Sequence, residues 1–149
     1  MYRRILAAID GSHASDRALE EAVRISREAG ASLLVVHALE DPPAVLEDNP
    51  YAEDALRTLK ASREEAGANL LKRAKADAAA AGVNAEATLL DEDAMPTPAR
   101  ILRAAQAFNA DLIVLGTHGH HGLRRAMLGS SAEGVVRMAP VPVLLVRTP

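Results

Sequence analysis

The sequence predicts an α/β protein in which a doubly wound, parallel sheet carries helices on both faces. The chain has 149 residues, a length that indicates a single domain spanning residues 1–149. Hydrophobic residues make up 49% and charged residues 25%, as in soluble globular proteins. Five short apolar runs alternate with segments of helical periodicity, the pattern that predicts parallel strands joined by right-handed helical crossovers.

The first strand and helix are predicted from the start of the chain. Residues 5–9 form a continuous apolar run that leads into Asp10-Gly11-Ser12, a pattern typical of a strand buried on both faces and followed by a turn. Apolar residues then recur every three or four positions as far as Ala29, where Gly30 suits the left-handed end of a helix.

A second buried strand is predicted at residues 33–39, and the Asp41-Pro42-Pro43 turn after it indicates a loop. Residues 51–81 are rich in Ala, Leu, Glu, Lys and Arg and predict one long or once-broken helix that Gly82 ends. The apolar stripe of this helix consists of Leu56, Leu59, Leu70, Leu71, Ala74 and Ala78.

The remaining elements complete five strands and four helices. Ala85–Leu90 is a partly polar strand, which favours an edge of the sheet. Thr97 and Pro98 predict a helix start, with the hydroxyl as the cap and the proline in the first turn. Residues 112–115 and Val143–Val146 are strongly apolar and predict the fourth and fifth strands.

Composition argues against several classes of function. The net charge is -3 and aromatic residues make up only 2%, so we expect no nucleic-acid partner. The chain has no cysteine, which excludes disulfides, thiolate nucleophiles and iron–sulfur clusters. No apolar run approaches the length of a signal peptide core or a membrane span, so we expect a cytoplasmic protein without a membrane partner.

Ligands of open parallel sheets bind beyond the carboxyl ends of the strands, which directs attention to the residues after Ile9, Leu39 and Leu115. Four of the nine glycines lie in residues 116–133, directly after the fourth predicted strand. Gly116 and its neighbour Gly119 lack side chains, which lets backbone amides approach a ligand or adopt a positive φ.

The end of this glycine-rich segment predicts a helix start. Ser130 and Glu133 have the spacing of a capping box, and a helix N-terminus offers unpaired N–H groups and a positive dipole end to an anion. Together with the glycines, it predicts a cradle for phosphate.

The glycine spacing distinguishes this segment from two common nucleotide-binding motifs. A Walker A loop requires a Lys after its last glycine, and no Lys follows Gly129. The first two glycines are separated by two residues, whereas the dinucleotide fingerprint has one residue between them. The spacing instead resembles the ATP-binding motif of the universal stress protein family, which is Gly, two residues, Gly, nine residues and then Gly-Ser. The resemblance extends over the whole chain through residues 3–12, 35–38, 111–119 and 139–146.

The resemblance implies a Rossmann-like sheet of strand order 3-2-1-4-5 and a regulator of the stress response that binds ATP with Mg²⁺ between strands one and four. Asp10 matches the acidic residue that accepts hydrogen bonds from the ribose, and Ala38 and Leu115 match positions that border the adenine. The positions matched to ribose and phosphate contacts are Gly116, Gly119, Gly129, Ser130 and Ser131. The resemblance also implies a homodimer through the last strand, Val143, Leu144, Leu145 and Val146.

Two departures from the family pattern limit what can be transferred. His120 stands where many relatives carry Arg, and a histidine is the weaker cation at neutral pH, so phosphate affinity could be lower or pH-dependent. Residues 91–98 replace a segment that usually contains glycine, and no role is assigned to them.

Plainer interpretations stay open for several of these residues. Asp10 could only order its turn, the glycines could only form turns, and Ser130 could serve as a helix cap as well as a ligand donor. Arg124 and Arg125 either reach the terminal phosphates or are solvated.

The histidines and the last strand also have plain interpretations. His118, His120 and His121 form no ordinary zinc pattern, so no metal site is predicted for them, and His37 is expected to be a hydrogen-bonded core residue. A helix or loop of the same subunit could cover the edge of the last strand in place of a second copy.

No nucleophile stands beside an evident base and orienting group, so we predict a binding module without catalytic residues. The alternatives are slow ATP hydrolysis or phosphate transfer by the His/Arg loop, and a scaffold of the same fold that binds no nucleotide.

Overall fold

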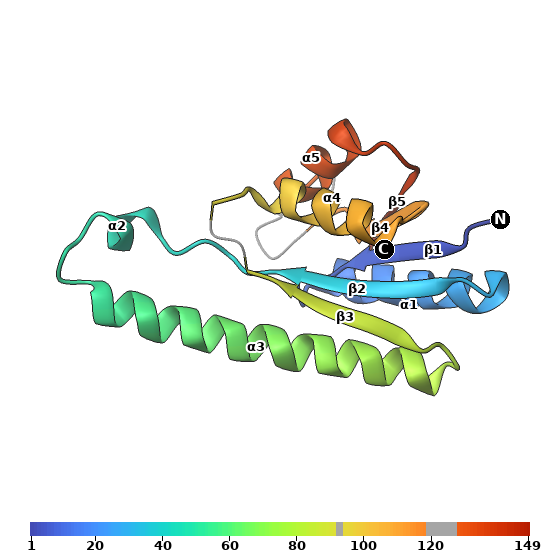
Figure 1. Cartoon of the computed structure of the whole chain (residues 1–149), viewed down its shortest axis with the longest axis horizontal. Coiled ribbons are helices and arrows are strands. Elements are labelled where there is room, and N and C mark those ends of the chain that lie inside the picture. The colour runs from blue at the N-terminus through green and yellow to red at the C-terminus, as the bar shows by residue number, and fades with distance from the viewer. Residues whose placement is uncertain (92–93, 119–127) are drawn as a thin grey trace.

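The computed structural model describes residues 1–91, 94–118 and 128–149. It contains a five-stranded sheet in which every neighbouring pair of strands is parallel and the order is β3-β2-β1-β4-β5 (Figure 1). The strands are β1 (Arg4–Ala8), β2 (Ser32–Ala38), β3 (Ala85–Leu90), β4 (Leu112–Gly116) and β5 (Val143–Val146). The predicted strand order and the edge position of β3 are therefore confirmed.

Helices cover both faces of the sheet, as predicted. The helices are α1 (His13–Ala29), α2 (Ala44–Glu47), α3 (Glu53–Ala80), α4 (Thr97–Phe108) and α5 (Ser130–Met138). α1 and α3 pack on one face, and α4 and α5 pack on the other (Figure 1). Each face has its own apolar core because the central strands are buried on both sides: Ile5 faces the α1 side and Leu6 the α4 side.

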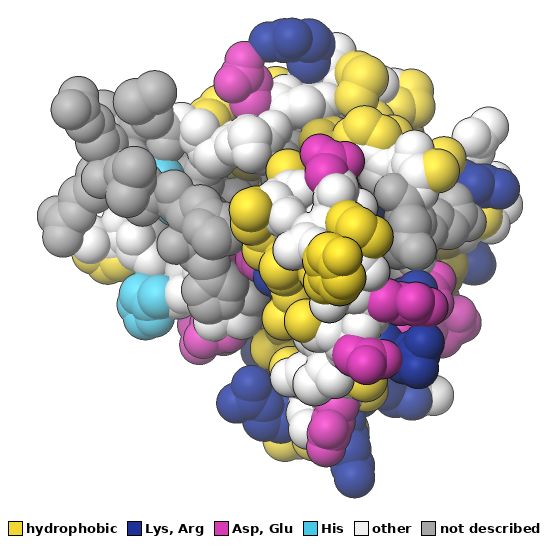
Figure 2. Space-filling model, turned by 90° about the vertical axis from the view of Figure 1, so that its left-hand side faces the viewer, with side chains coloured by type: hydrophobic (Ala, Val, Ile, Leu, Met, Phe, Trp, Pro, Cys, Tyr) yellow, Lys and Arg dark blue, Asp and Glu magenta, His cyan; other side chains and the backbone are white. Residues whose placement is uncertain are grey.

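The segment predicted at residues 51–81 is one unbroken helix, α3, and the short helix α2 precedes it in the predicted loop. The residues of α3 that are buried lie in its second half, from Gly67 to Ala78. Its first half extends past the end of the sheet, which leaves Leu56 and Leu59 of the predicted stripe only half-buried (Figure 1). Figure 2 views this end of the molecule and shows hydrophobic side chains gathered on the surface.

Helix ends follow local backbone geometry. Gly30 caps α1 with φ of 64°, in the left-handed conformation expected of it, and its amide bonds to the carbonyl of Ser26. The predicted cap of α4 is wrong: Pro96 is the N-cap and Thr97 is already helical. The Thr97 hydroxyl lies instead 3.5 Å from the guanidinium of Arg100, so it accepts from a side chain and not from a backbone amide of the first turn.

Candidate functional site

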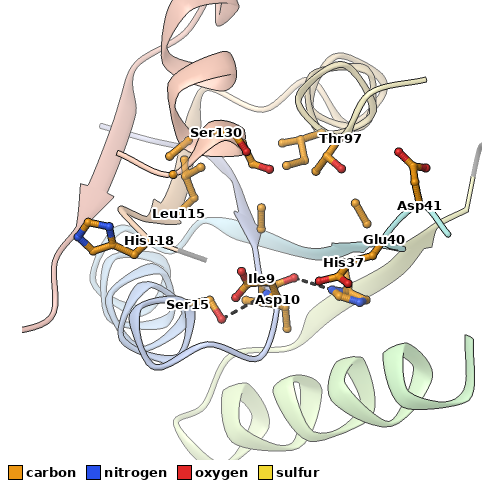
Figure 3. Close-up of a pocket in the computed structure, with 17 residues that line it drawn as sticks. Ile9, Asp10, Ser15, His37, Glu40, Asp41, Thr97, Leu115, His118 and Ser130 are labelled. Carbon is orange, nitrogen blue, oxygen red and sulfur yellow. Dashed lines mark hydrogen bonds between the residues drawn. The ribbon is translucent and has the colours of Figure 1, made fainter. Parts of the chain in front are cut away.

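A cavity of about 380 Å³ opens at the carboxyl ends of β1, β2 and β4, where the strand order reverses. Seven of the eight residues predicted to bind ATP line it: Asp10, Ala38, Leu115, Gly116, Gly129, Ser130 and Ser131. The eighth, Gly119, lies outside the described residues, as do the predicted phosphate contacts His120, Arg124 and Arg125. The tertiary structure thus gathers residues from four strand and helix ends around one opening (Figure 3).

Asp10 follows β1 and forms part of the cavity wall (Figure 3). Its Oδ1 accepts a 2.9 Å hydrogen bond from the amide of Ser12, and its own amide donates to Ser15 Oγ at 3.2 Å. The carboxylate therefore orders the turn before α1, as the plainer interpretation expects. Among the residues that the structure describes, no donor reaches Oδ2, so this oxygen remains available to a hydroxyl in the cavity.

Two serines next to Asp10 are engaged in the start of α1. Ser12 is the N-cap, and its hydroxyl accepts from the amide of Ser15 at 3.2 Å. The Ser15 hydroxyl donates in turn to the carbonyl of Ser12 at 3.1 Å. Both hydroxyls therefore stabilise the start of α1, and these hydrogen bonds also fix the turn that carries Asp10.

The start of α5 forms another wall of the cavity, but not in the predicted way. Gly129 is the N-cap and Ser130 the first helical residue, and no side chain bonds to the cap, so the capping box with Glu133 does not form. Glu133 instead pairs with Arg137 one turn further along the helix. The side chain of Ser130 is consequently not needed to cap its own helix.

The amides at this helix start divide into two groups. The amide of Gly129 donates to the carbonyl of Thr117 at 2.7 Å and is not available to a ligand, contrary to the prediction. The first intrahelical bond runs from the amide of Glu133 to the carbonyl of Gly129. The amides of residues 130–132 precede it and point out of the first turn, where helices bind anions.

Gly116 lines the cavity, but it does not adopt the positive φ that was one of the two predicted uses of a glycine there. Its φ is not positive, since the positive-φ glycines among the described residues are Gly11, Gly30 and Gly82. A Cβ at Gly116 would lie 2.8 Å from the carbonyl carbon and from the Cβ of Ala14. The missing side chain therefore lets the start of α1 pack against the end of β4, and this packing brings the two walls of the cavity together.

His37 lines the cavity on the β2 side and was predicted only as a core residue. The hydrogen bond expected of it is present: Nδ1 lies 2.8 Å from the carbonyl oxygen of Ile9. A carbonyl oxygen can only accept, so Nδ1 carries the proton and Nε2 of the neutral ring is an acceptor. A Cβ at Gly67 in α3 would lie 3.0 Å from Cδ2 of this ring, so the glycine gives the imidazole its space.

Further lining residues were missed by the sequence analysis. Glu40 and Asp41 follow β2, and Thr97 and Ile101 come from the first turns of α4. The rule that ligands bind beyond strand ends directs attention to the residues after Leu39, so it could have identified Glu40 and Asp41. No signal in the sequence indicated that α4 would begin over the same opening.

The charged side chains that line the cavity in the described part of the chain are Asp10, Glu40 and Asp41, all acidic. Within residues 1–91, 94–118 and 128–149, no three His, Asp or Glu side chains form a group able to hold a metal ion. Magnesium usually takes one or two carboxylates and completes its shell with phosphate oxygens and water. The donor set thus fits a cation that enters together with a polyphosphate better than one held by the protein alone.

The fold and the cavity define this chain as a Rossmann-like α/β protein with a small-ligand crevice at the switch point of its sheet. The model of the universal stress protein family matches residues 1–147. The chain therefore belongs to the universal stress protein family.

Individual relatives support the same assignment. The chain is 41% identical over 147 residues to a universal stress protein of Thermus aquaticus, which covers 99% of this chain and all of the relative. Universal stress protein UspA from Lactobacillus plantarum superposes with a TM-score of 0.85 at 26% identity, covering 98% of both chains. A universal stress protein in complex with cAMP has a TM-score of 0.72 at 28% identity and covers 99% of both chains.

Among the described residues, no helix combines the length and apolar character needed to cross a bilayer.

Proposed function

We propose that this universal stress protein binds ATP, with Mg²⁺, in the crevice between β1 and β4 and acts in the cytoplasm as a nucleotide-dependent regulator of the stress response. The observation that carries the proposal is the pairing of two complementary groups across one cavity. Asp10 offers a carboxylate oxygen on one wall, and the first turn of α5 offers amides that have no acceptor within their helix on another. These groups suit ribose hydroxyls and phosphate oxygens, respectively.

The volume and the lining support a nucleotide. About 380 Å³ lies within the range of small-molecule sites, and Ile9, Ile101 and Leu115 provide an apolar surface for a base. The relative that was crystallised with cAMP shares the fold over nearly its whole length and carries an adenine nucleotide. Any Mg²⁺ would be held chiefly by the phosphates, with Asp10 in the cavity wall as a carboxylate able to complete its shell.

Isothermal titration with ATP, ADP, AMP, cAMP and adenosine, each with and without Mg²⁺, tests this proposal. Asp10→Asn keeps a carbonyl oxygen for the amide of Ser12 but removes the charge, whereas Asp10→Ala removes both. We expect Asp10→Ala to weaken ATP binding by about tenfold or more, since hydrogen bonds to a charged group contribute about 1.5–3 kcal/mol. With 2′,3′-dideoxy-ATP, which lacks the ribose hydroxyls, the same substitution should have little effect.

Wild-type protein that binds none of these nucleotides would refute the proposal and leave the interpretation as a nucleotide-free scaffold. We propose binding without efficient turnover, because the hydroxyls of Ser12 and Ser15 beside Asp10 are engaged in capping α1. Phosphate release measured on the same samples tests this point. Turnover that rises with protein concentration and disappears in Asp10→Ala would favour the hydrolysis alternative.

We also propose a homodimer through the open edge of β5. The four residues Val143, Leu144, Leu145 and Val146 are apolar but only half-buried in a single chain. The carbonyls of Pro142 and Val146 bond to β4, so the amide of Leu145 points to the open edge. Leu145→Pro removes that donor and should give a monomer in sedimentation experiments, whereas the control Leu145→Val should stay dimeric.

A further inference from the structure

Two arginines from opposite faces of the sheet meet at the segment that follows β2. Arg63 lies in α3 and Arg100 in α4. Between them they donate hydrogen bonds to the backbone carbonyls of three successive residues, 39, 40 and 41. Two of these residues line the cavity, so the wall at the end of β2 is held from both sides of the sheet.

Arg100 joins three separate chain segments. Its Nη1 donates to the carbonyl of Leu39 at 2.9 Å and to that of Leu90 at 3.2 Å, and its Nε donates to the carbonyl of Met95 at 2.9 Å. The ends of β2 and β3 and the segment before α4 are thereby tied to one side chain. Only 3% of this side chain is exposed, and a charge so buried is tolerated when such partners surround it.

The charge of Arg100 is offset at the same place. Its Nη2 lies 3.5 Å from Asp41 Oδ1, and the Asp41 side chain is 61% exposed. The carboxylate therefore lies at the cavity surface and the guanidinium behind it. A wall with its cation neutralised from within suits an uncharged base better than a phosphate.

Arg63 completes the arrangement from the other face of the sheet. Its Nη1 donates to the carbonyl of Glu40 at 3.0 Å and to that of Asp41 at 2.8 Å. These carbonyls lie beyond the last residue of β2 and so beyond the sheet's own hydrogen bonds. One nitrogen thus serves both carbonyls, while Nη2 of the same guanidinium lies 3.9 Å from Glu40 Oε2.

We propose that Arg63 and Arg100 are positioning residues for the nucleoside end of the bound nucleotide. They fix residues 39–41 so that the segment next to Ala38 presents a preformed wall to the base. Neither arginine lines the cavity itself, so both act through the backbone that they hold. This inference rests on the proposed function, and it adds to it the part of the ligand that this wall recognises.

Titration of adenosine and of ATP with Mg²⁺ into Arg63→Ala, Arg63→Lys and Arg100→Lys tests the inference. Arg57→Ala is the matched control, because Arg57 lies on the same helix and, among the residues that the structure describes, pairs with Glu53 and Asp54, away from the cavity. We expect Arg63→Ala and Arg100→Lys to weaken both ligands by the same factor of about ten, as the loss of charge-assisted hydrogen bonds implies. Arg63→Lys should recover part of the affinity, and the stoichiometry should stay at one ligand per chain.

The outcomes separate this inference from the proposed function. Wild-type affinity in both Arg63→Ala and Arg100→Lys overturns the inference and leaves nucleotide binding intact. A loss for ATP that is absent for adenosine also overturns it, because the wall would then serve the phosphates. Fewer sites per chain at unchanged affinity would show a folding defect only, which overturns it as well. If the wild-type protein binds neither ligand, the proposed function fails and this inference falls with it.

Discussion

The two ends of the cavity differ in how the protein satisfies their backbone polar groups. At the end of β2, the backbone carbonyls of residues 39–41 accept hydrogen bonds from Arg63 and Arg100, so these polar groups are paired within the chain. At the start of α5, the amides of residues 130–132 have no acceptor within their helix. A wall with its polar groups paired can select a ligand by shape, whereas a wall with spare donors favours an anion.

The largest effect is expected from Gly116→Ala, which would push the walls apart. The new Cβ would lie 2.8 Å from backbone and side-chain atoms of Ala14. To relieve this clash the backbone of α1 would have to shift, which disrupts its packing on the sheet and costs free energy. We expect a loss of about 2–3 kcal/mol in the free energy of unfolding, measured with urea, together with weaker binding of ATP.

Gly82→Ala is the control for that experiment. Gly82 has φ of 86° but open space around it, so alanine there meets backbone strain without a clash. A loss of about 1 kcal/mol with unchanged ATP affinity is expected. Equal losses for the two variants would contradict the packing role assigned to Gly116.

Gly67→Ala disturbs the β2 side alone. The added Cβ would lie 2.8 Å from Leu89 Cδ1 and 3.0 Å from His37 Cδ2, and both side chains can shift. Alanine also raises helix propensity by about 1 kcal/mol, so we expect little net change in stability. Affinity for adenosine and for ATP should fall together by about three- to tenfold as the imidazole moves in the cavity. A loss confined to ATP would contradict the division of the cavity into two ends.

Asp111→Asn alters the amino-terminal end of the strands, opposite the cavity, and should leave both ends of the cavity unaffected. Partial burial acts to raise the pKa of Asp111, but hydrogen bonds from the amides of Arg3 and Arg4 outweigh it and hold the pKa below its ordinary value. A lowered pKa in the folded state means that the stabilisation is present above the ordinary value and is lost as the pH falls through the folded value.

We therefore expect Asp111→Asn to lower the free energy of unfolding by about 1 kcal/mol at pH 7. The difference from the wild type should shrink below about pH 4, where the carboxyl of the unfolded chain is protonated. Urea unfolding across this pH range measures it, and nucleotide affinity at pH 7 should not change. A difference independent of pH would show that the charge of Asp111 is not involved.

The smallest effect is expected from Ser130→Ala. An N-cap serine would contribute about 1 kcal/mol, but Ser130 makes no capping bond, so stability should stay within experimental error. ATP affinity should fall by at most about threefold, because the backbone amides of the first turn remain, and adenosine affinity should not change. A loss of about 1 kcal/mol in the free energy of unfolding would instead indicate that Ser130 caps α5.

Much of the candidate site could be predicted because motif and topology coincide. Asp10, Ala38 and Leu115 stand at strand ends, and the strand-end rule places such residues around one crevice. The apolar strand around His37 predicts a core residue, but its position next to the strand end brings the ring to the cavity. The arrangement around Arg100 could not be predicted, since its partners come from segments distant in the sequence.

Residue patterns alone predicted the strands and the main helices, because continuous apolar runs must be buried on both faces and amphipathic helices must cover them. The order of the strands in the sheet was predicted only from the resemblance to the universal stress protein family. Only the tertiary structure decided which polar groups at the strand ends are paired and which remain open. The capping of α5 by Gly129, the contact of Gly116 with Ala14 and the two arginines on residues 39–41 depend on distances between segments. Such distances are set by the packing of layers, and residue spacing along the chain does not encode them directly.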